Sequence, residues 1–522
     1  MQTLRTLLLA SLCSVVVACS TTQSISNGKA SLPEVIPPGE GVVVLKLVGV
    51  TRPSISNAKF RTLTIKSIAD GTLYDIQDVA PAGAADAVFA GSLPPGRYEI
   101  ADLAAWGNAP GLLLALTVSD FQTVDKRLPP FEVSPGAVTN LGTVAMGTDA
   151  AKKELAVAVY SNSGGRESAI TGLDARSRDK VGKLRQLVWT GAQSSNLESA
   201  AGFVKRLADK IAVPEIGPRD EILVGGPLGF VHSLGADRHW RSENIGSLES
   251  VVYVRTLPDG RIFAGTDNGR YYIRSVDGAS WTEHRIPTDR SAVIGVEPLG
   301  GTANALQIAM LDGATLFGPT KYVIAIIDDI DTGQGYSEVL KFDEPSAYGR
   351  LPMYFDGASL CVAFNHVGLS RVADIFRIDP VTRTKVSETL DSWVLRTYGL
   401  ADGTLAQHRM NGMSDYPAFS ADGGKTWTRL TTAAPDSARF FTSELGYGSE
   451  VVSTGWSSVT STLSKTFDRG ESWKRFGTPF ESSGSLTILR RAGGELIVHH
   501  RGGILTSADE GATWKKIWPS VH

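Results

Sequence analysis

Ser420 to Trp427 reads SADGGKTW, and nearly the same eight residues recur from Thr466 to Trp473 (TFDRGESW) and from Ser507 to Trp514 (SADEGATW). A copy one residue shorter runs from Ser275 to Trp281 (SVDGASW), and Ser233 to Trp240 (SLGADRHW) keeps only the outer residues. The shared pattern is a hydroxyl residue, an Asp, a Gly, a second hydroxyl residue and a Trp at fixed offsets. Such self-similarity indicates a repeat architecture, and it decides how the rest of the chain is interpreted.

Each position of this repeated motif suits a turn between two strands. The carboxylate can accept hydrogen bonds from N–H groups of its own turn, and the Gly can adopt the positive φ that closes it. The Trp would open the next strand and fill the gap between adjacent sheets. A catalytic site brings different residues together once, whereas this fastening recurs, so we interpret it as structural. The residues given this structural role are Ser275, Asp277, Trp281, Ser420, Asp422, Gly424, Thr426, Trp427, Thr466, Asp468, Gly470, Ser472, Trp473, Ser507, Asp509, Gly511, Thr513 and Trp514.

The repeated motif resembles the Asp-box (BNR) repeat of sialidases and related β-propellers. Where the motif recurs in neighbouring copies, successive Trp residues are about 41 to 46 residues apart, which is the period of a four-stranded propeller blade. The longer interval between Trp281 and Trp427 has room for three blades of about 49 residues each. The sequence therefore predicts an all-β chain in which residues 216–522 form a propeller of about seven four-stranded blades.

The N-terminal segment combines Arg5 with an apolar run from Leu7 to Ala18, which is shorter than the ~20 residues needed to span a bilayer. Val16-Val17-Ala18-Cys19 closes this segment and resembles a bacterial lipobox. The resemblance implies that residues 1–18 are a lipoprotein signal peptide, that Cys19 is lipidated, and that acyl chains such as palmitate anchor the protein to the cell envelope. In a Gram-negative host, Ser20 after the Cys implies sorting to the outer membrane. The alternative is a plain secretory signal peptide cut nearby.

Residues 19–40 are rich in Ser, Thr, Asn and Pro, which predicts a flexible tether. Residues 41–148 consist of alternating or β-branched runs split by Pro, Gly and Asp turns, which predicts a β-sandwich of about 100 residues. The strings LPPGRYEIADL (93–103) and FEVSPGAVTNLGTV (131–144) resemble small transthyretin-like or carboxypeptidase-regulatory-like sandwiches of secreted proteins. That resemblance implies a spacer or binding role for this segment.

Residues 149–215 are predicted to form a helical connector on the side of the propeller. A capping box at Ser195 and Glu198 opens an amphipathic helix that extends to Ile211, and a second helix is predicted over 178–189. Because the first helix would occupy the place of the innermost strand of blade one, another strand must close the ring. The predicted closing strand is Leu155 to Tyr160 (LAVAVY).

Composition limits the possible partners and cofactors. With 51 basic and 54 acidic residues the net charge is −3, so nucleic acid is not indicated as a partner. Cys13 leaves with the signal peptide and Cys19 is lipidated, which leaves Cys361 as an unpaired, small core residue. The turn DDIDTGQG (328–335) lacks the distal Glu of an EF-hand loop, so it predicts a plain acidic turn. Neither a metal site nor a cofactor is predicted.

The loops of an up-and-down propeller separate structure from recognition. If strands A to D follow one another outward, the A–B and C–D turns, which carry the repeated motif, share one face. The longer B–C and D–A loops share the other face, where converging polar and aromatic groups suit carbohydrate or peptide recognition. The candidate ligand-binding residues on that face are Asp267, Asn268, His366, Arg409, Asp415, Tyr416, Trp456, His499, His500 and Arg501.

Two classes of function fit these features. The first is a cell-envelope lipoprotein whose propeller binds or scaffolds a glycan or an envelope protein. The second is an exo-acting glycoside hydrolase of the sialidase-like or xyloglucanase-like type, in which two of Asp267, Asp415, Glu344 and Glu481 would act as a carboxylate pair. Sialidases place an Arg in a Phe-Arg-Ile-Pro motif near the start of the propeller, whereas the nearest string here, Phe376 to Asp379, lies in mid-propeller and lacks the Pro. We therefore favour binding over catalysis, and the catalytic residues are not assigned.

Overall fold

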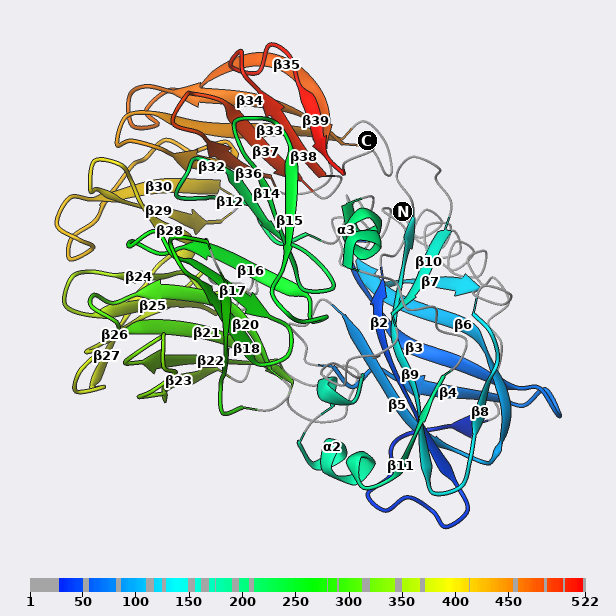
Figure 1. Cartoon of the computed structure of the whole chain (residues 1–522). Coiled ribbons are helices and arrows are strands. Elements are labelled where there is room, and N and C mark those ends of the chain that lie inside the picture. The colour runs from blue at the N-terminus through cyan, green and yellow to red at the C-terminus, as the bar shows by residue number, and fades with distance from the viewer. Residues whose placement is uncertain are drawn as a thin grey trace, which may run out of the picture.

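The structure is a computed structural model that describes residues 28–49, 56–80, 86–108, 117–123, 128–148, 155–160, 169–173, 175–189, 197–205, 211–278, 280–288, 291–311, 320–342, 350–366, 371–412, 414–453, 459–482, 486–500 and 503–519. Regular structure in these ranges is almost entirely β. Two sheets formed by the N-terminal part of the chain lie beside a ring of seven four-stranded sheets (Figure 1). Lipidation of Cys19 falls outside the described residues.

The ring is a seven-bladed β-propeller, as the spacing of the motif predicts. Every blade is one antiparallel sheet whose four strands follow one another in sequence. Blade one consists of β12 (Glu215–Ile216), β13 (Ile222–Gly225), β14 (Phe230–Leu234) and β15 (Trp240–Asn244), and blade two of β16 (Val251–Thr256), β17 (Ile262–Thr266), β18 (Arg270–Arg274) and β19 (Trp281–Arg285). Blade three consists of β20 (Ser291–Pro298), β21 (Asn304–Leu311), β22 (Thr320–Ile327) and β23 (Ser337–Phe342), and blade four of β24 (Met353–Phe355), β25 (Leu360–Asn365), β26 (Ala373–Ile378) and β27 (Lys385–Leu390). Blades five to seven are β28 (Trp393–Gly399), β29 (Leu405–Asn411), β30 (Ser414–Ser420), β31 (Thr428–Arg429); β32 (Asp436–Phe440), β33 (Gly446–Ser453), β34 (Val459–Thr466), β35 (Lys474–Ser482); and β36 (Thr487–Arg490), β37 (Leu496–His500), β38 (Gly503–Ser507), β39 (Lys515–Trp518).

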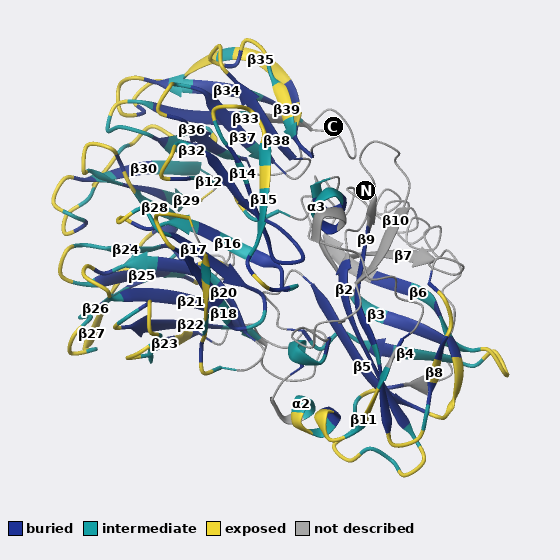
Figure 2. Cartoon of the chain, viewed as in Figure 1, coloured by how far each residue is buried: buried dark blue, intermediate teal, exposed yellow. Residues whose placement is uncertain are grey.

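Burial follows the order of the strands in each blade. The second strands are almost wholly buried, because their side chains pack against the neighbouring blades, as in β17 and β25. Exposed residues gather on outermost strands such as β27 and β35 (Figure 2). Cys361 on β25 is buried and free, and burial raises its thiol pKa to about 12, in keeping with a core residue.

The N-terminal part of the chain forms two sheets that share one core. The first contains β1 (Gly28–Lys29), β4 (Leu73–Gln77), β3 (Ser56–Ser67), β6 (Gly96–Asn108), β7 (Thr117–Thr123) and β8 (Phe131–Val133). The second contains β10 (Leu155–Tyr160), β9 (Ala137–Thr148), β2 (Gly41–Gly49), β5 (Ala87–Leu93) and β11 (Arg185–Val188). Leu45 and Phe89 from the second sheet pack with Ile65 and Ile100 from the first. We call this pair of sheets the double sheet.

The predicted tether is too long at its C-terminal end. Gly28 and Lys29 already pair with β4, and Ala30 lies in the core of the double sheet with 5% of its surface exposed. Ile36 packs against the outer side of the second sheet. A composition rich in Ser and Pro did not reveal this, because a strand of two residues leaves no pattern in the sequence. Within the described residues, ordered chain begins at Gly28 rather than after residue 40.

The predicted closure of the ring by Leu155 to Tyr160 is wrong. This segment is β10 and pairs antiparallel with β9, with Leu155 opposite Thr148 and Tyr160 opposite Thr143. The innermost strand of blade one is instead β12, whose Ile216 pairs with Ile222. The helix before it is described as α3 (Leu197–Lys205), and residues 211–214 are not helical. The chain leading into Glu215 can therefore supply the missing strand itself.

The connector belongs mainly to the double sheet rather than to the side of the propeller. A 3-10 helix, η1 (Ala169–Gly172), and α2 (Ala175–Gly182) bury Ala169, Leu173 and Val181 against Val42 and Val44 of β2. The helix predicted over 178–189 is wrong in its second half, because the chain leaves α2 at Gly182 and forms β11 parallel to β9. The buried residues of α3 lie between the two parts and pack with residues of the second sheet and of blade one.

The repeated motif forms the same network of hydrogen bonds in each intact copy. In blade five, Ser420 Oγ donates to Asp422 Oδ1 (2.7 Å) and accepts from Gly424 N–H (2.7 Å). Thr426 donates to the two carboxylate oxygens of Asp422 through its N–H (2.9 Å) and its hydroxyl (2.6 Å). Gly424 has φ +94°, where an L side chain is strained. All oxygens of the Asp are thus occupied within its own turn.

Three Trp residues of the motif, Trp281, Trp427 and Trp514, reach the blade that precedes their own. Trp427 packs edge-on against Tyr354 of blade four, with ring centroids 5.8 Å apart. Trp514 Nε1 donates to the Thr478 carbonyl of blade six (3.2 Å), and Trp281 Nε1 donates to a Glu243 carboxylate oxygen of blade one (3.3 Å). The motif therefore connects blades as well as closing turns.

Blade three lacks the motif and uses charge instead. Its acidic turn pairs Asp331 with Arg261 of blade two and Asp328 with Arg383 of blade four. The turn is therefore held by arginines, as expected of a plain acidic turn. Nowhere in the described ranges do three or more His, Cys, Asp or Glu side chains group in a way that would hold a metal ion.

Candidate binding site on the propeller axis

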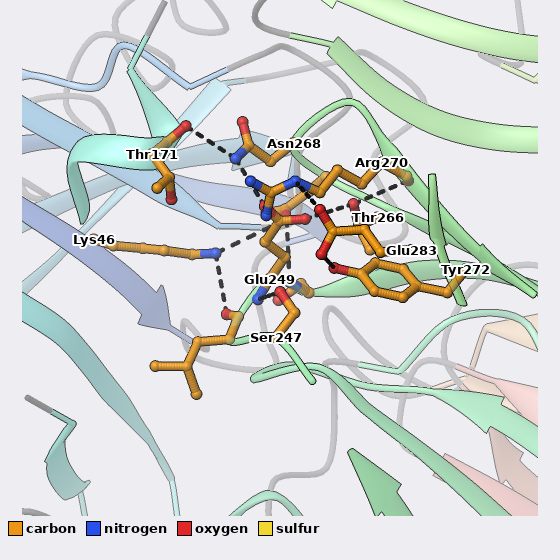
Figure 3. A network of polar contacts seen from close by, with 12 residues as sticks. Lys46, Thr171, Ser247, Glu249, Thr266, Asn268, Arg270, Tyr272 and Glu283 are labelled. Atoms are coloured by element: carbon orange, nitrogen blue, oxygen red, sulfur yellow. Dashed lines mark hydrogen bonds and ion pairs between the residues drawn. The ribbon is translucent and has the colours of Figure 1, made fainter. Parts of the chain in front are cut away.

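Two of the candidate ligand-binding residues lie at a junction between the propeller and the double sheet: Asp267 is buried, with 4% of its surface exposed, and Asn268 is half-buried. Figure 3 shows Asn268 close to Thr171 and Glu249 in this junction. Lys46 Nζ on β2 lies 3.3 Å from Asp86 Oδ2 and 3.9 Å from Asp267 Oδ1. Asn268 Nδ2 donates to the Thr171 carbonyl at 3.0 Å. The prediction that these two residues face a ligand is wrong, because the double sheet docks on the B–C and D–A loops of the first blades.

The part of the junction around Asp267 is polar. Glu249, with 3% of its surface exposed, accepts hydrogen bonds from Thr266 Oγ1 (2.8 Å), Asn268 Nδ2 (2.8 Å) and Arg270 (2.6 Å). Ser250 Oγ donates to Asp86 Oδ2 at 2.5 Å. Buried charges without partners are costly, so this set of pairs fixes one relative orientation of the two parts.

The other candidates on this face do not converge on one point. His366 is exposed and lies 2.9 Å from Asp374, Tyr416 lies under the Arg429 guanidinium, and Arg409 donates to Gln407 Oε1 (2.6 Å). Burial lowers the pKa of both His499 and His500 to about 4, so both are neutral at pH 7. Trp456 and Arg501 lie outside the described residues.

Asp415 is the one candidate that lies among charged groups of the inner strands. His408 Nδ1 lies 3.3 Å from Asp415 Oδ2, and His408 Nε2 lies 2.9 Å from the Tyr398 hydroxyl. That hydroxyl also accepts a hydrogen bond from Phe440 N–H of blade six (2.8 Å). His408 has 1% of its surface exposed, so this Asp–His–Tyr chain is a fixed support for the Tyr398 ring.

The innermost strands bring several arginines close to the propeller axis. Innermost strands surround the axis of a propeller, so charged side chains on them can face one another across it. The carboxyl of Glu215 on blade one interacts with Arg439 of blade six, Arg255 of blade two and Arg350 of blade four, although burial is the larger effect and raises its pKa. Arg396 of blade five interacts in turn with Arg439. We call these four arginines, with Glu215 and Glu297, the axial cluster.

Arg255 is neutralised within the axial cluster. Its guanidinium donates to Glu297 Oε2 of blade three at 2.6 Å and to the Val296 carbonyl. Burial is the largest single effect and works against the charge of Arg255, but Glu297, Tyr253 and Glu215 together outweigh it and raise the Arg255 pKa. This pair ties the first strands of blades two and three together, so it is not available to a ligand.

Arg350, Arg396 and Arg439 form no ion pair with a carboxylate anywhere in the described part of the chain. The Arg350 guanidinium lies 4.6 Å from the Tyr253 ring centroid, and that of Arg439 lies 5.4 Å from the ring of Tyr398. Burial lowers the pKa of Arg350 and of Arg396, but an arginine keeps its charge at pH 7. Glu215 acts on Arg350 and Arg439, and Asp415 acts on Arg396, without a direct ion pair. The donor groups of these three guanidiniums are therefore not taken up by any described carboxylate in direct contact.

Sequence reasoning missed these arginines because it looked for the site in the loops. The available signal was a charged residue inside an otherwise apolar first strand of a blade, as Arg255 in VVYVRT (251–256). A single charged residue on a strand with alternating polarity is usually predicted to be solvent-exposed. It faces the axis only because the blades close into a ring.

No family model matches this sequence, and no curated protein matches it. Solved β-propellers resemble its fold. "Oligogalacturonate lyase in complex with manganese" has 11% identity and a TM-score of 0.38, covering 51% of this chain and 77% of that chain. "YCF48 bound to D1 peptide" has 13% identity and a TM-score of 0.37, covering 57% of this chain and 93% of that chain. "Structure of Dos1 propeller" has 13% identity and a TM-score of 0.34, covering 59% of this chain and 78% of that chain. These likenesses concern the fold alone.

The helices that the structure describes are all too short, or too polar, to cross a bilayer. Nothing more follows from this for the location of the protein, because the segment with the lipobox-like sequence lies outside the described residues.

Proposed function

We propose that this protein is a lipoprotein of the bacterial cell envelope, anchored through Cys19 in the outer membrane, whose propeller binds an anionic envelope ligand. The observation that carries the proposal is the set of three guanidinium groups, those of Arg350, Arg396 and Arg439, that form no direct ion pair with a carboxylate among the described residues. Guanidinium donors grouped on three consecutive blades and partly open to solvent supply the hydrogen bonds that an anionic ligand needs, which supports a binding role. The ligand would be a glycan or an envelope protein.

The placement of the carboxylates supports binding over hydrolysis. Asp267 is buried in the junction, and Glu481 is exposed on β35, the outermost strand of blade six. Glu344 lies outside the described residues, which leaves Asp415 of the four carboxylates considered. None of these positions supports the carboxylate pair that a glycoside hydrolase needs.

One observation favours hydrolysis as a second candidate function. Burial, with a contribution from Asp415, raises the pKa of Asp436 at the start of β32. A carboxyl with a raised pKa beside a second carboxyl is the arrangement of the acid and its partner in glycosidases. If this pair were catalytic, Asp436→Asn would abolish release of reducing sugar from a panel of envelope glycans. Failure of the native protein to release any sugar would dismiss this candidate.

Retention of the full chain on anionic polymers tests the binding proposal. The probes are polygalacturonate, dextran sulfate and poly-glutamate, with neutral dextran as the baseline. We expect at least one anionic probe to bind, and Arg396→Gln with Arg439→Gln to weaken that binding by about tenfold or more. The matched control is Arg475→Gln, a side chain 69% exposed on an outermost strand. Equal losses in both variants would show that binding depends on overall charge and would overturn the proposal.

A further inference from the structure

The axial cluster and the acidic groups beside it define the chemistry of the ligand more narrowly, and this step rests on the proposed function. Arg350, Arg396 and Arg439 come from blades four, five and six, which are consecutive in the ring. Three guanidiniums on neighbouring blades suit a ligand with several negative charges along its length. A single small anion would leave part of this charge unpaired.

The aromatic rings leave the donor edges of two guanidiniums for the ligand. Arg350 lies over the face of Tyr253, and Arg439 lies over Tyr398 and 5.9 Å from the Phe441 ring centroid. A guanidinium that stacks on a ring keeps its N–H groups in its own plane. That planar fork matches the two oxygens of a carboxylate.

Two carboxylates, those of Asp415 and Asp436, lie on the side of the axial cluster that Arg396 occupies. Asp415 interacts with Arg396 and with Asp436, and a β-bridge to Ala434 places Asp415 beside the segment that leads into β32. Asp436 is exposed, so its oxygens are open to a ligand. Carboxylates repel a densely charged polyanion but accept hydrogen bonds from hydroxyl groups.

The arginines of the protein would bind carboxylates of the ligand, and its aspartates would accept hydrogen bonds from hydroxyl groups of the ligand. Both requirements are met by a hydroxyl-rich ligand with one negative charge per repeating unit. We infer that the axial site binds an oligomeric uronate, a segment of an acidic polysaccharide in which every sugar carries one carboxylate. An acidic peptide offers the same carboxylates without the hydroxyl groups. A sulfated or phosphorylated polymer carries a charge density that Asp415 and Asp436 oppose.

Titration calorimetry of the full chain with hexagalacturonate tests this inference. The methyl ester of the same oligomer keeps every sugar hydroxyl and removes the charge. Maltohexaose is neutral, and hexaglutamate and dextran sulfate supply charge without uronate. We expect hexagalacturonate to bind at least about tenfold more tightly than each of these ligands. The comparison between the free acid and its ester uses the native protein, so its result does not depend on whether any variant folds.

Two variants separate the two halves of the site. Arg396→Gln with Arg439→Gln is expected to weaken hexagalacturonate by about a hundredfold, or about tenfold per arginine. Asp436→Asn is expected to weaken hexagalacturonate while leaving dextran sulfate equal or tighter, because it removes an acceptor and a repulsive charge together. Arg475→Gln, on the outermost strand, serves as the control and is expected to change the affinity for neither hexagalacturonate nor dextran sulfate.

The remaining outcomes overturn one or both proposals. If hexaglutamate binds as tightly as hexagalacturonate and depends on the same arginines, the axial site stands and the ligand is a peptide. If dextran sulfate binds more tightly than any carboxylate, the site responds to charge density alone and the uronate inference is wrong. If no anionic probe binds the native protein, the proposed function falls together with the uronate inference.

Discussion

Trp240 Nε1 donates a hydrogen bond to the Ile517 carbonyl at 2.9 Å, although the two residues lie at opposite ends of the propeller sequence. Trp240 also packs edge-on against Trp518, with ring centroids 4.9 Å apart. This is the contact that three Trp residues of the repeated motif make with the preceding blade, here between blade one and blade seven. The ring is thus closed by side chains, since no strand is shared across the seam.

Charged groups complete the seam. Arg491 of blade seven, with 6% of its surface exposed, donates to the Asp220 carbonyl (2.6 Å) and to the Leu234 carbonyl (3.0 Å) of blade one. Arg238 forms an ion pair with Glu495, and Trp518 lies in a buried cluster with Ile222. Packing and buried hydrogen bonds therefore replace the ladder of a shared strand.

Trp240→Ala is expected to lower the free energy of unfolding by about 3 kcal/mol, because it removes packing and a hydrogen bond at the only seam not crossed by the chain. Trp240→Phe keeps much of the packing and loses the hydrogen bond, so about 1 kcal/mol is expected. Urea denaturation followed by Trp fluorescence measures both. Val276→Ala, at a side chain with 58% exposure, is the control. Equal stability of Trp240→Ala and the control would show that the seam is held elsewhere.

The turns of the repeated motif should make stability depend on acid. Hydrogen bonds from the hydroxyl groups of Ser472 and Thr466 hold the pKa of Asp468 at about 2, below its ordinary value of 3.8. Because the folded pKa is the lower one, the stabilisation is fully present above the ordinary value and is lost as the pH falls through about 2. Asp468→Asn should therefore be less stable at pH 5 and lose less stability between pH 4 and pH 2.

Thermal melts across this pH range measure the slope for Asp468→Asn against the native protein. Glu471→Gln, three residues further along the same turn, is the charge-matched control. If our structural interpretation of the motif holds, Asp468→Asn leaves binding of the anionic probes unchanged. A variant that lost binding while keeping its melting temperature would make the motif part of the site.

The sequence predicted the repeated elements of the fold, the blades, but not the elements that occur only once. Seven blades followed from the spacing of Trp240, Trp281, Trp427, Trp473 and Trp514, because a periodic signal adds up over copies. The two-residue strand β12 carries no period, so the ring closure was assigned to a more strand-like segment. The sandwich assignment of residues 41–148 stays a prediction, although two sheets with a shared core lie there.

The site could not be predicted from the loops because it depends on long-range packing. Asp267 was chosen for its loop, but Lys46 of the double sheet covers it. Arg350, Arg396 and Arg439 stand on or next to first strands, where their grouping exists only once the ring has closed. Short-range patterns report turns and strands, whereas a site on an axis is a property of the whole ring.

Cys19→Ser tests the predicted anchor. Without a thiol at the lipobox-like position no acyl chain can be attached, so we expect complete loss of radiolabelled palmitate and release of the protein from the membrane fraction. Cys361→Ser is the control, because that thiol is buried and its raised pKa leaves it protonated. Unchanged pelleting of Cys19→Ser without label would mean that another contact holds the protein on the membrane.

The junction around Lys46 gives the last prediction. The side chains of Lys46, Asp86 and Asp267 are 9%, 0% and 4% exposed, so Lys46→Met would remove a buried ammonium group that lies 3.3 Å from the Asp86 carboxylate and 3.9 Å from that of Asp267. Removing one partner of a buried ion pair costs about 3 kcal/mol or more. Calorimetry should show the cooperative unfolding of the double sheet and propeller split into two transitions, and hydrogen exchange at residues 267 and 268 should rise because the junction opens. Lys66→Met is the matched control: its ion pair with Glu99 lies on the other sheet with the lysine 45% exposed, so less than about 1 kcal/mol is expected. A triple variant, Lys46→Met with Asp86→Asn and Asp267→Asn, should recover most of the lost stability, since no unpaired charge remains. If Lys46→Met unfolds in one transition at the native temperature, the two parts are held by the apolar contacts of α3 and not by this network.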